Sequence, residues 1–165
     1  MLLKKLVILI TALLLSACGY HLRGPLVLPG GQKNVYLEGG SEKLREQFSG
    51  LLGASSIKLV SSPEKAGIVV KILDEDSQRR ALSLNAGGAA NNFELSYHID
   101  FELLDSKNKL LIPSQPIEIK RQYYNDQLAV LAKGNEETLI RNEMYQQAVR
   151  SIINRAKFAL DEDPK

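Results

Sequence analysis

The chain of 165 residues is 44% hydrophobic and 24% charged, which is the composition of one ordinary globular domain with its own core. Its single cysteine and two histidines exclude an intrachain disulfide and a multi-cysteine metal cluster, so we predict no metal and no cofactor. If Lys4 and Lys5 are removed with a signal peptide, basic and acidic residues balance, which argues against a nucleic-acid partner.

Residues 1–17 have the parts of a secretory signal peptide. A basic start precedes the apolar run Leu6–Leu15, and two small residues, Ser16 and Ala17, follow it. The run is too short for a transmembrane helix, which needs about 20 apolar residues. We therefore expect this segment to be cleaved as a lipoprotein signal peptide.

The residues Leu15–Cys18 resemble the bacterial lipobox, in which the cysteine sulfur receives a diacylglyceryl group and the signal is cut just before it. Cys18 is then the first residue of the mature protein and its lipid anchor, and two or more acyl chains hold a protein stably on a membrane. Gly19 stands where an aspartate would retain a lipoprotein in the inner membrane. The anchor is therefore expected in the inner leaflet of the outer membrane.

A tether of residues 18–33 is expected to lead to a single domain of residues 34–161, with a short tail at 162–165. Asn34–Gly39 is typical of a short strand, and Ser41 can cap the helix that follows it. The next strand is expected at Ile57–Val60. The apolar positions of the predicted helix recur at the helical period, at Leu44, Phe48, Leu51 and Leu52.

Three longer strands are predicted at residues 68–84, 93–104 and 110–124, and the loop Asn85–Asn92 separates the first two. Strand 93–104 alternates strictly, which indicates a sheet with one buried face. Pro113 and Pro116 indicate that the last strand lies at an edge or has an irregular start. The expected inward residues of strand 93–104 are Phe93, Leu95, Tyr97, Ile99, Phe101 and Leu103.

A final helix is expected to begin at Asn135 as its N-cap, after the apolar stretch Leu128–Ala132. Glu136 and Glu137 lie in its first turn, where they favour the helix dipole. The element order is then β-α-β-β-β-β-α. This order predicts an α+β fold, a two-layer α/β sandwich with two helices on one face of a mainly antiparallel sheet.

Ser96, His98 and Asp100 share one face of strand 93–104 and raise the question of a hydrolase. Alternate residues of a strand stand roughly 7 Å apart, too far for the hydrogen bonds of a catalytic triad. The loop Asn85–Asn92 is rich in glycine but lacks the lysine and the helix of a phosphate-binding loop. We therefore predict that the chain is not an enzyme.

Basic side chains are spread over the sheet and its loops, and any of them can contact a phosphate. They are Arg79, Arg80, Lys120, Arg121 and Lys133.

Two blocks of sequence, "CGYHLRG" after the signal and "LAKGNEETLIRNEMYQQA" near the C-terminus, resemble the lipopolysaccharide-assembly lipoprotein family, LptE, of Gram-negative bacteria. The resemblance implies a plug inside the large outer-membrane β-barrel of the lipopolysaccharide translocon. Such a plug assists the assembly of the barrel and contacts lipopolysaccharide. The expected location is the periplasmic side of the outer membrane, inside the partner barrel.

The resemblance also carries over one functional residue. Lys133 matches the family's lysine in the Ala-Lys-x-Asn-Glu segment, which is implicated in contact with lipopolysaccharide. A second basic position of the family falls near Asn85, and Arg79 and Arg80 are its nearest substitutes. The predicted lipopolysaccharide-binding residues are therefore Lys133, Arg79 and Arg80.

Two other functions remain open on sequence alone. The first alternative is an accessory lipoprotein of another envelope lipid-transport complex, and the second is a small lipid-anchored hydrolase. Co-purification with a large β-barrel protein distinguishes the first from a translocon plug. Loss of turnover on substitution of His98 identifies the second.

Overall fold

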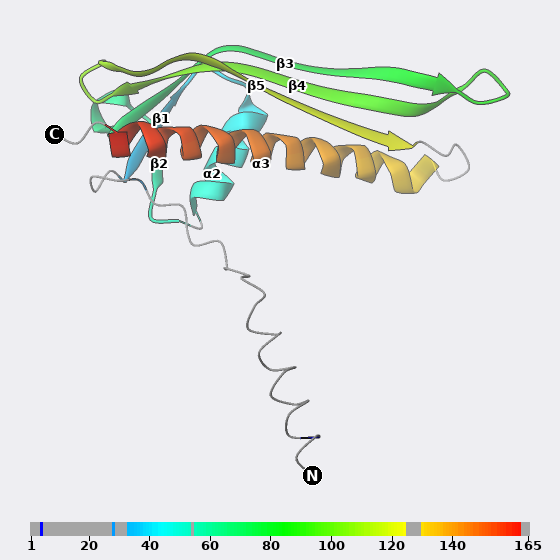
Figure 1. Cartoon of the computed structure of the whole chain (residues 1–165), viewed down its shortest axis with the longest axis horizontal. Helices are drawn as coiled ribbons and strands as arrows, with labels where there is room; N and C mark the ends of the chain where they lie inside the picture. Colours follow the sequence, from blue (N-terminus) through cyan, green and yellow to red (C-terminus); the bar gives the residue numbers. More distant parts are fainter. Residues whose placement is uncertain (1–3, 5–27, 29–32, 54, 125–129, 163–165) are drawn as a thin grey trace.

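The computed structural model describes residues 4, 28, 33–53, 55–124 and 130–162 (Figure 1). The predicted signal peptide, Cys18 and nearly all of the predicted tether lie outside these residues. Leu28 and Lys33 are the described residues of the tether, and the side chain of Leu28 is buried in the core of the domain. The tether therefore joins the folded domain before the first strand begins.

A five-stranded sheet with the order β2-β1-β3-β4-β5 forms one layer of the molecule. Strand β1 pairs in parallel with β2 and β3, whereas β3, β4 and β5 pair antiparallel, so the sheet is mixed. The position of β5 at an edge confirms the expectation drawn from its prolines. The strands are β1 (Asn34–Glu38), β2 (Lys58–Val60), β3 (Ile68–Leu84), β4 (Ala90–Asp105) and β5 (Leu110–Tyr124).

Two α-helices, α2 (Glu42–Gly53) and α3 (Val130–Glu162), cover one face of this sheet, and a 3₁₀ turn, η2 (Pro63–Lys65), precedes β3 (Figure 1). The predicted order β-α-β-β-β-β-α and the two-layer α+β sandwich are confirmed. The hairpin of β3 and β4 extends beyond the first turn of α3. We call this end of the molecule distal, and the end with β1, β2 and α2 proximal.

The core lies between the helices and the helix-facing side of β4. Every odd-numbered residue from Phe93 to Leu103 is buried, as the alternation predicts. Tyr97 and Phe101 are among the largest fully buried side chains. Helix α3 contributes an apolar stripe at helical spacing, because a helix presents positions three and four apart to the same neighbour. The buried residues of that stripe are Met144, Ala148, Val149, Ile152, Ile153 and Ala156.

Ser41 begins α2 as predicted, and its hydroxyl accepts a hydrogen bond from the backbone N–H of Leu44 at 3.1 Å. The carboxylate of Glu75 on β3 accepts bonds from the Ser41 N–H at 2.6 Å and from the Tyr97 hydroxyl at 2.9 Å. Gly40 precedes the cap with φ +75°, and a Cβ there would lie 3.0 Å from the side chain of Leu44. One carboxylate thus ties the start of α2 to the sheet.

Helix α3 begins earlier than the sequence predicts. It starts at Val130, so Asn135 is not its N-cap and Lys133 lies within the helix instead of ahead of it. Leu131, Ala132 and Lys133 are good helix formers, and the one following glycine costs only about 1 kcal/mol in a helix. A helix that long is favoured further by packing along the sheet, which a local capping signal does not report.

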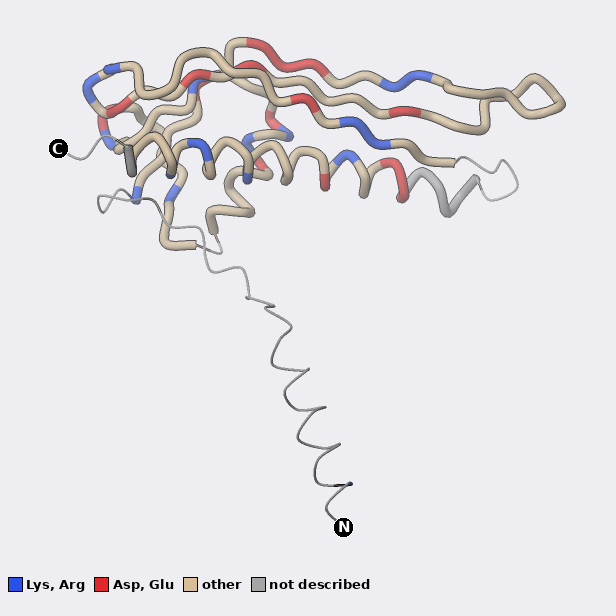
Figure 2. The backbone as a smooth tube through the Cα atoms, viewed as in Figure 1, with Lys and Arg blue, Asp and Glu red and all other residues tan. Residues whose placement is uncertain are grey.

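The open face of the sheet, away from the helices, carries the even-numbered residues of β4 from Glu94 to Glu102, which alternate with the buried ones and are all polar. Acidic and basic residues follow one another along the long strands (Figure 2). Lys71 on β3 pairs with Glu102 on β4 at 3.2 Å. Nearer the distal end, Arg80 pairs with Glu94 at 2.8 Å, and Glu94 is buried although it lies on this face. The described chain therefore has an apolar face against its helices and a charged face with no helix over it.

Candidate functional site

Arg79 and Arg80 lie on opposite faces of the sheet. They are consecutive in β3, where successive side chains alternate between the two faces, and they pair in register with Leu95 and Glu94 of β4. Arg79 therefore lies on the side of α3, and Arg80 on the open side. The structure does not bring these two predicted contact residues together as one basic site.

On the helix side, Arg79 belongs to a cluster that joins all three long strands to α3. Its Nε lies 2.9 Å from the Tyr123 hydroxyl of β5 and 3.2 Å from Oε2 of Glu137 on α3. Its guanidinium also lies 3.7 Å from the ring centroid of Phe93, and that ring stacks on Tyr123 at 5.6 Å. The positive charge of Arg79 is therefore already paired within the protein.

Glu137 is the centre of this cluster. The Tyr123 hydroxyl donates a hydrogen bond to Glu137 Oε2 at 2.5 Å, and Arg141 reaches Oε1 with its Nε at 2.9 Å and its Nη2 at 2.8 Å. Arg141 also donates to the Ser77 hydroxyl of β3 at 2.8 Å. We call these six residues the Glu137 cluster: Ser77, Arg79, Phe93, Tyr123, Glu137 and Arg141.

The cluster fixes the charge state of its members. Partial burial of Glu137 favours the neutral acid, but the hydrogen bonds from Tyr123 and Arg141 and the two guanidinium charges hold its pKa below the ordinary value. Burial raises the pKa of Tyr123, and the hydrogen bond to Glu137 raises it further. Glu137 is thus a carboxylate that accepts from a neutral tyrosine.

Lys133 occupies α3 one turn before Glu137, and its side chain lies outside the described part of the structure. Positions four apart in a helix share a face. Glu137 and Arg141 both contact β3, so the Glu137 cluster fixes the orientation of the helix segment that carries Lys133.

On the open face, the His98 side chain lies near two carboxylates. His98 Nε2 is 3.6 Å from a carboxylate oxygen of Asp100 and 4.0 Å from one of Asp74 on β3. Neither distance is a hydrogen bond, so the prediction that these residues are too far apart for the hydrogen bonds of a triad is not contradicted. The structure gives no hydrogen bond from Ser96 to His98 either. Ser96, His98 and Asp100 therefore do not have the hydrogen bonds of a catalytic triad.

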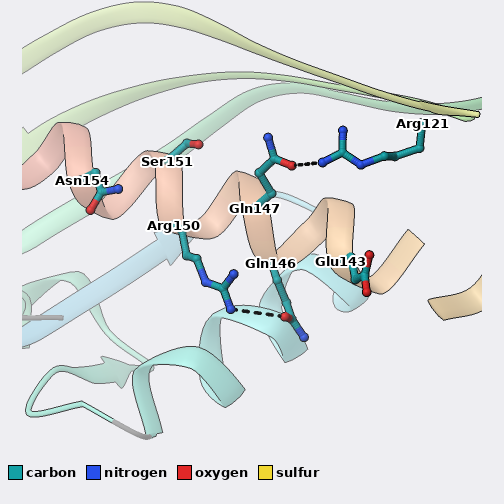
Figure 3. A pocket seen from close by; sticks show the side chains of 7 residues that line it. All are labelled: Arg121, Glu143, Gln146, Gln147, Arg150, Ser151 and Asn154. Atoms are coloured by element: carbon teal, nitrogen blue, oxygen red, sulfur yellow. Dashed lines mark hydrogen bonds between the residues drawn. The ribbon is translucent and has the colours of Figure 1, made fainter. Parts of the chain in front are cut away.

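A polar groove of about 530 Å³ lies on the outer side of α3, next to the edge strand β5 (Figure 3). Sequence reasoning missed it, although six of its residues follow the helical spacing of three and four and could have been noticed as a polar stripe. Arg121, predicted as one of several scattered basic groups, joins this stripe from β5. The groove is lined by Arg121, Glu143, Gln146, Gln147, Arg150, Ser151 and Asn154.

Neither a metal centre nor a membrane-spanning helix is found among the described residues. They contain no group of three or more His, Cys, Asp or Glu side chains placed to hold a metal ion. Within the same part of the chain, no helix combines the length and the apolar character that crossing a membrane requires.

Comparison with known proteins identifies a family and a fold. The family model for lipopolysaccharide assembly, LptE, matches residues 32–156. The LPS-assembly lipoprotein LptE of Pectobacterium atrosepticum is 24% identical over 91% of this chain and 82% of its own length. The protein of that name from Yersinia enterocolitica is 24% identical over 94% of this chain and 73% of its own length.

Solved structures agree with this assignment. Lipoprotein B from Nitrosomonas europaea superposes with a TM-score of 0.66 at 28% identity and covers 84% of this chain and 90% of that one. The rare lipoprotein B from Shewanella oneidensis gives a TM-score of 0.59 at 25% identity, over 74% of this chain and 92% of its own. Because the LptE family model matches most of the folded domain, this chain belongs to the LptE lipopolysaccharide-assembly family.

Proposed function

We propose that this protein is an outer-membrane lipoprotein that fills the lumen of a large β-barrel lipopolysaccharide translocon, helps that barrel to assemble and binds lipopolysaccharide. Membership of the lipopolysaccharide-assembly family is the observation that carries the proposal. The diacylglyceryl group on Cys18 holds the chain in the inner leaflet, with the domain on the periplasmic side. The protein acts by binding and has no catalytic role.

The open face of the sheet supports a position inside a barrel. The lumen of an outer-membrane barrel is polar, so a protein within it needs a polar surface. Three ion pairs lie on this face. Two of them join β3 to β4, Lys71 with Glu102 and Arg80 with Glu94, and the third joins Glu118 to Lys120 within β5. A face of paired charges can contact polar groups without exposing apolar surface.

For contact with lipopolysaccharide, Lys133 is the leading residue. Arg79 and Arg80 are the other two, and their surroundings separate their roles. The side chain of Arg80 is 68% exposed and has one partner, whereas Arg79 binds Glu137 and Tyr123. We therefore assign direct contact to Lys133 and Arg80, and assign to Arg79 the positioning of the helix that carries Lys133.

The experiment that tests the partner is a detergent extraction of membranes and a pull-down through a C-terminal tag. We expect a large outer-membrane β-barrel protein as the main co-purifying species. Lys133→Glu should leave this co-purification intact but weaken binding of lipopolysaccharide at least several-fold, because a charge-assisted contact becomes a repulsive one. Unchanged glycolipid binding would remove Lys133 from the site.

The experiment that tests the anchor is Cys18→Ala. We expect an unlipidated precursor whose signal is not removed, because no other side chain of the chain can form the thioether. Metabolic labelling with a fatty acid, followed by gel analysis, measures this. A Cys18→Ala protein that still carries label would contradict the proposed anchor.

A further inference from the structure

The polar groove beside α3 has the chemistry of a binding site for a phosphorylated saccharide. None of its seven lining side chains is apolar, so an acyl chain would gain nothing there. Two arginines and one glutamate give the lining an excess of positive charge. A volume of about 530 Å³ is within the range of small-ligand sites.

Arg121 is held by two hydrogen bonds before any ligand arrives. Arg121 donates from Nη2 to Oε1 of Gln147 at 2.5 Å and from Nη1 to the carbonyl oxygen of Lys120 at 2.9 Å. Arg150 donates to Oε1 of Gln146 at 3.5 Å. A guanidinium group that is fixed as in Arg121 loses less conformational entropy when it binds an anion.

These same bonds turn the glutamines into donors. Each glutamine accepts with its carbonyl oxygen, so its NH₂ group is left to donate. Figure 3 shows Arg121 of β5 reaching Gln147 above the helix, and Arg150 of α3 reaching Gln146 below it. A ligand in the groove would meet donors from both glutamines and from both guanidinium groups.

The acidic residue of the groove refines the ligand class. Glu143 would repel a bare phosphate, but its carboxylate can accept hydrogen bonds from sugar hydroxyls. Ser151 and Asn154 can both donate and accept, which suits hydroxyl groups. The combination of arginines for an anion and a carboxylate for hydroxyls fits a sugar that carries a phosphate better than it fits either group alone.

From this lining we infer that the groove of Arg121, Glu143, Gln146, Gln147 and Arg150 binds a phosphorylated saccharide. Where the saccharide is the head of lipopolysaccharide, the inference rests on the proposed function. A free sugar phosphate has the same chemistry, and the experiment separates the two sources.

The experiment uses the full chain in detergent micelles and three probes: intact lipopolysaccharide, its deacylated phosphorylated oligosaccharide, and the same oligosaccharide after phosphatase treatment. The readout is the NMR signals of the Gln146 and Gln147 side-chain amides, followed by titration. We expect the phosphorylated oligosaccharide to shift these signals at lower concentration than the dephosphorylated one.

The variant Arg121→Gln with Arg150→Gln removes both guanidinium groups. We expect its affinity for the phosphorylated oligosaccharide to fall about tenfold or more, because two charge-assisted contacts are lost. Lys58→Gln with Lys65→Gln is the matched control, since it removes the same charge from the exposed side chains of β2 and η2 at the proximal end and should bind normally. Thermal unfolding of both variants checks that each is folded.

Each outcome decides the inference. Equal losses in the double arginine variant and the lysine control would overturn it, as would phosphate-independent binding or unmoved glutamine signals. The inference would also be overturned if the double arginine variant no longer co-purified with the barrel and the unchanged protein did not bind the oligosaccharide. The groove would then be a contact with the partner protein. If Lys133→Glu alone weakens binding of intact lipopolysaccharide, the proposed function stands and the groove fails. If the oligosaccharide binds and intact lipopolysaccharide does not, the groove stands with a free sugar phosphate as its source.

Discussion

The proximal and distal halves of β3 are held to the rest of the protein by different forces. At the proximal end, Ile68 and Val70 are buried in the apolar core, and Val69 between them is buried as well. From Leu73 to Leu84 nearly every residue is exposed, and the strand is joined to α3 through the Glu137 cluster instead. The proximal end is therefore stabilised by apolar burial, and the distal end by directional polar contacts that leave surface available for binding.

The largest effect is expected in the proximal core. Phe101→Ala should lower the free energy of unfolding by about 3–5 kcal/mol, because it empties the space of a fully buried ring. Chemical denaturation measures the loss. Asp100→Ala is the control, because Asp100 directly precedes Phe101 but lies on the open face. This substitution should lower the free energy of unfolding by less than about 0.5 kcal/mol. Equal costs at the two positions would contradict the assignment of the sheet faces.

A smaller and more local effect is expected from Glu137→Gln. The substitution keeps the size of the side chain but leaves Arg79 and Arg141 without their carboxylate, at a cost of about 1–3 kcal/mol. Amide hydrogen exchange should show the loss in distal β3 and in the first turns of α3. Protection of Val70 and its neighbours should remain. Uniform loss along β3 would mean that the two halves unfold as one unit.

The pH dependence should separate the same two halves more gently. Since the pKa of Glu137 is held below its ordinary value of 4.5, its contribution is complete above that value and is lost as pH falls through the lower, folded-state value. Distal amides of the native protein should therefore lose protection as the pH falls below 4.5, before the apolar core does. In Glu137→Gln this acid step should be absent. A step that persists unchanged must come from another carboxylate.

The sequence alone predicts the parts of this protein that depend on local periodicity. The alternation from Phe93 to Leu103 identifies the buried face of β4, and Ser41 marks the start of α2, because each signal lies within a few residues of what it describes. The prolines of β5 likewise reveal an edge strand. Element order and the two-layer architecture follow from these signals and do not require any long-range contact to be known.

Tertiary packing decides the parts that join distant residues. Arg79 and Arg80 are equivalent in sequence, but the pleat of β3 gives one of them Glu137 as its partner and the other Glu94. Helix α3 begins at Val130 rather than Asn135, and the contacts of its later residues Glu137 and Arg141 with β3 are long-range ones that a local capping signal does not report. The groove beside α3 likewise exists only because β5 brings Arg121 to the helix. The partners of a charged side chain are set by the surfaces that hydrophobic burial brings together, and local sequence does not encode that choice.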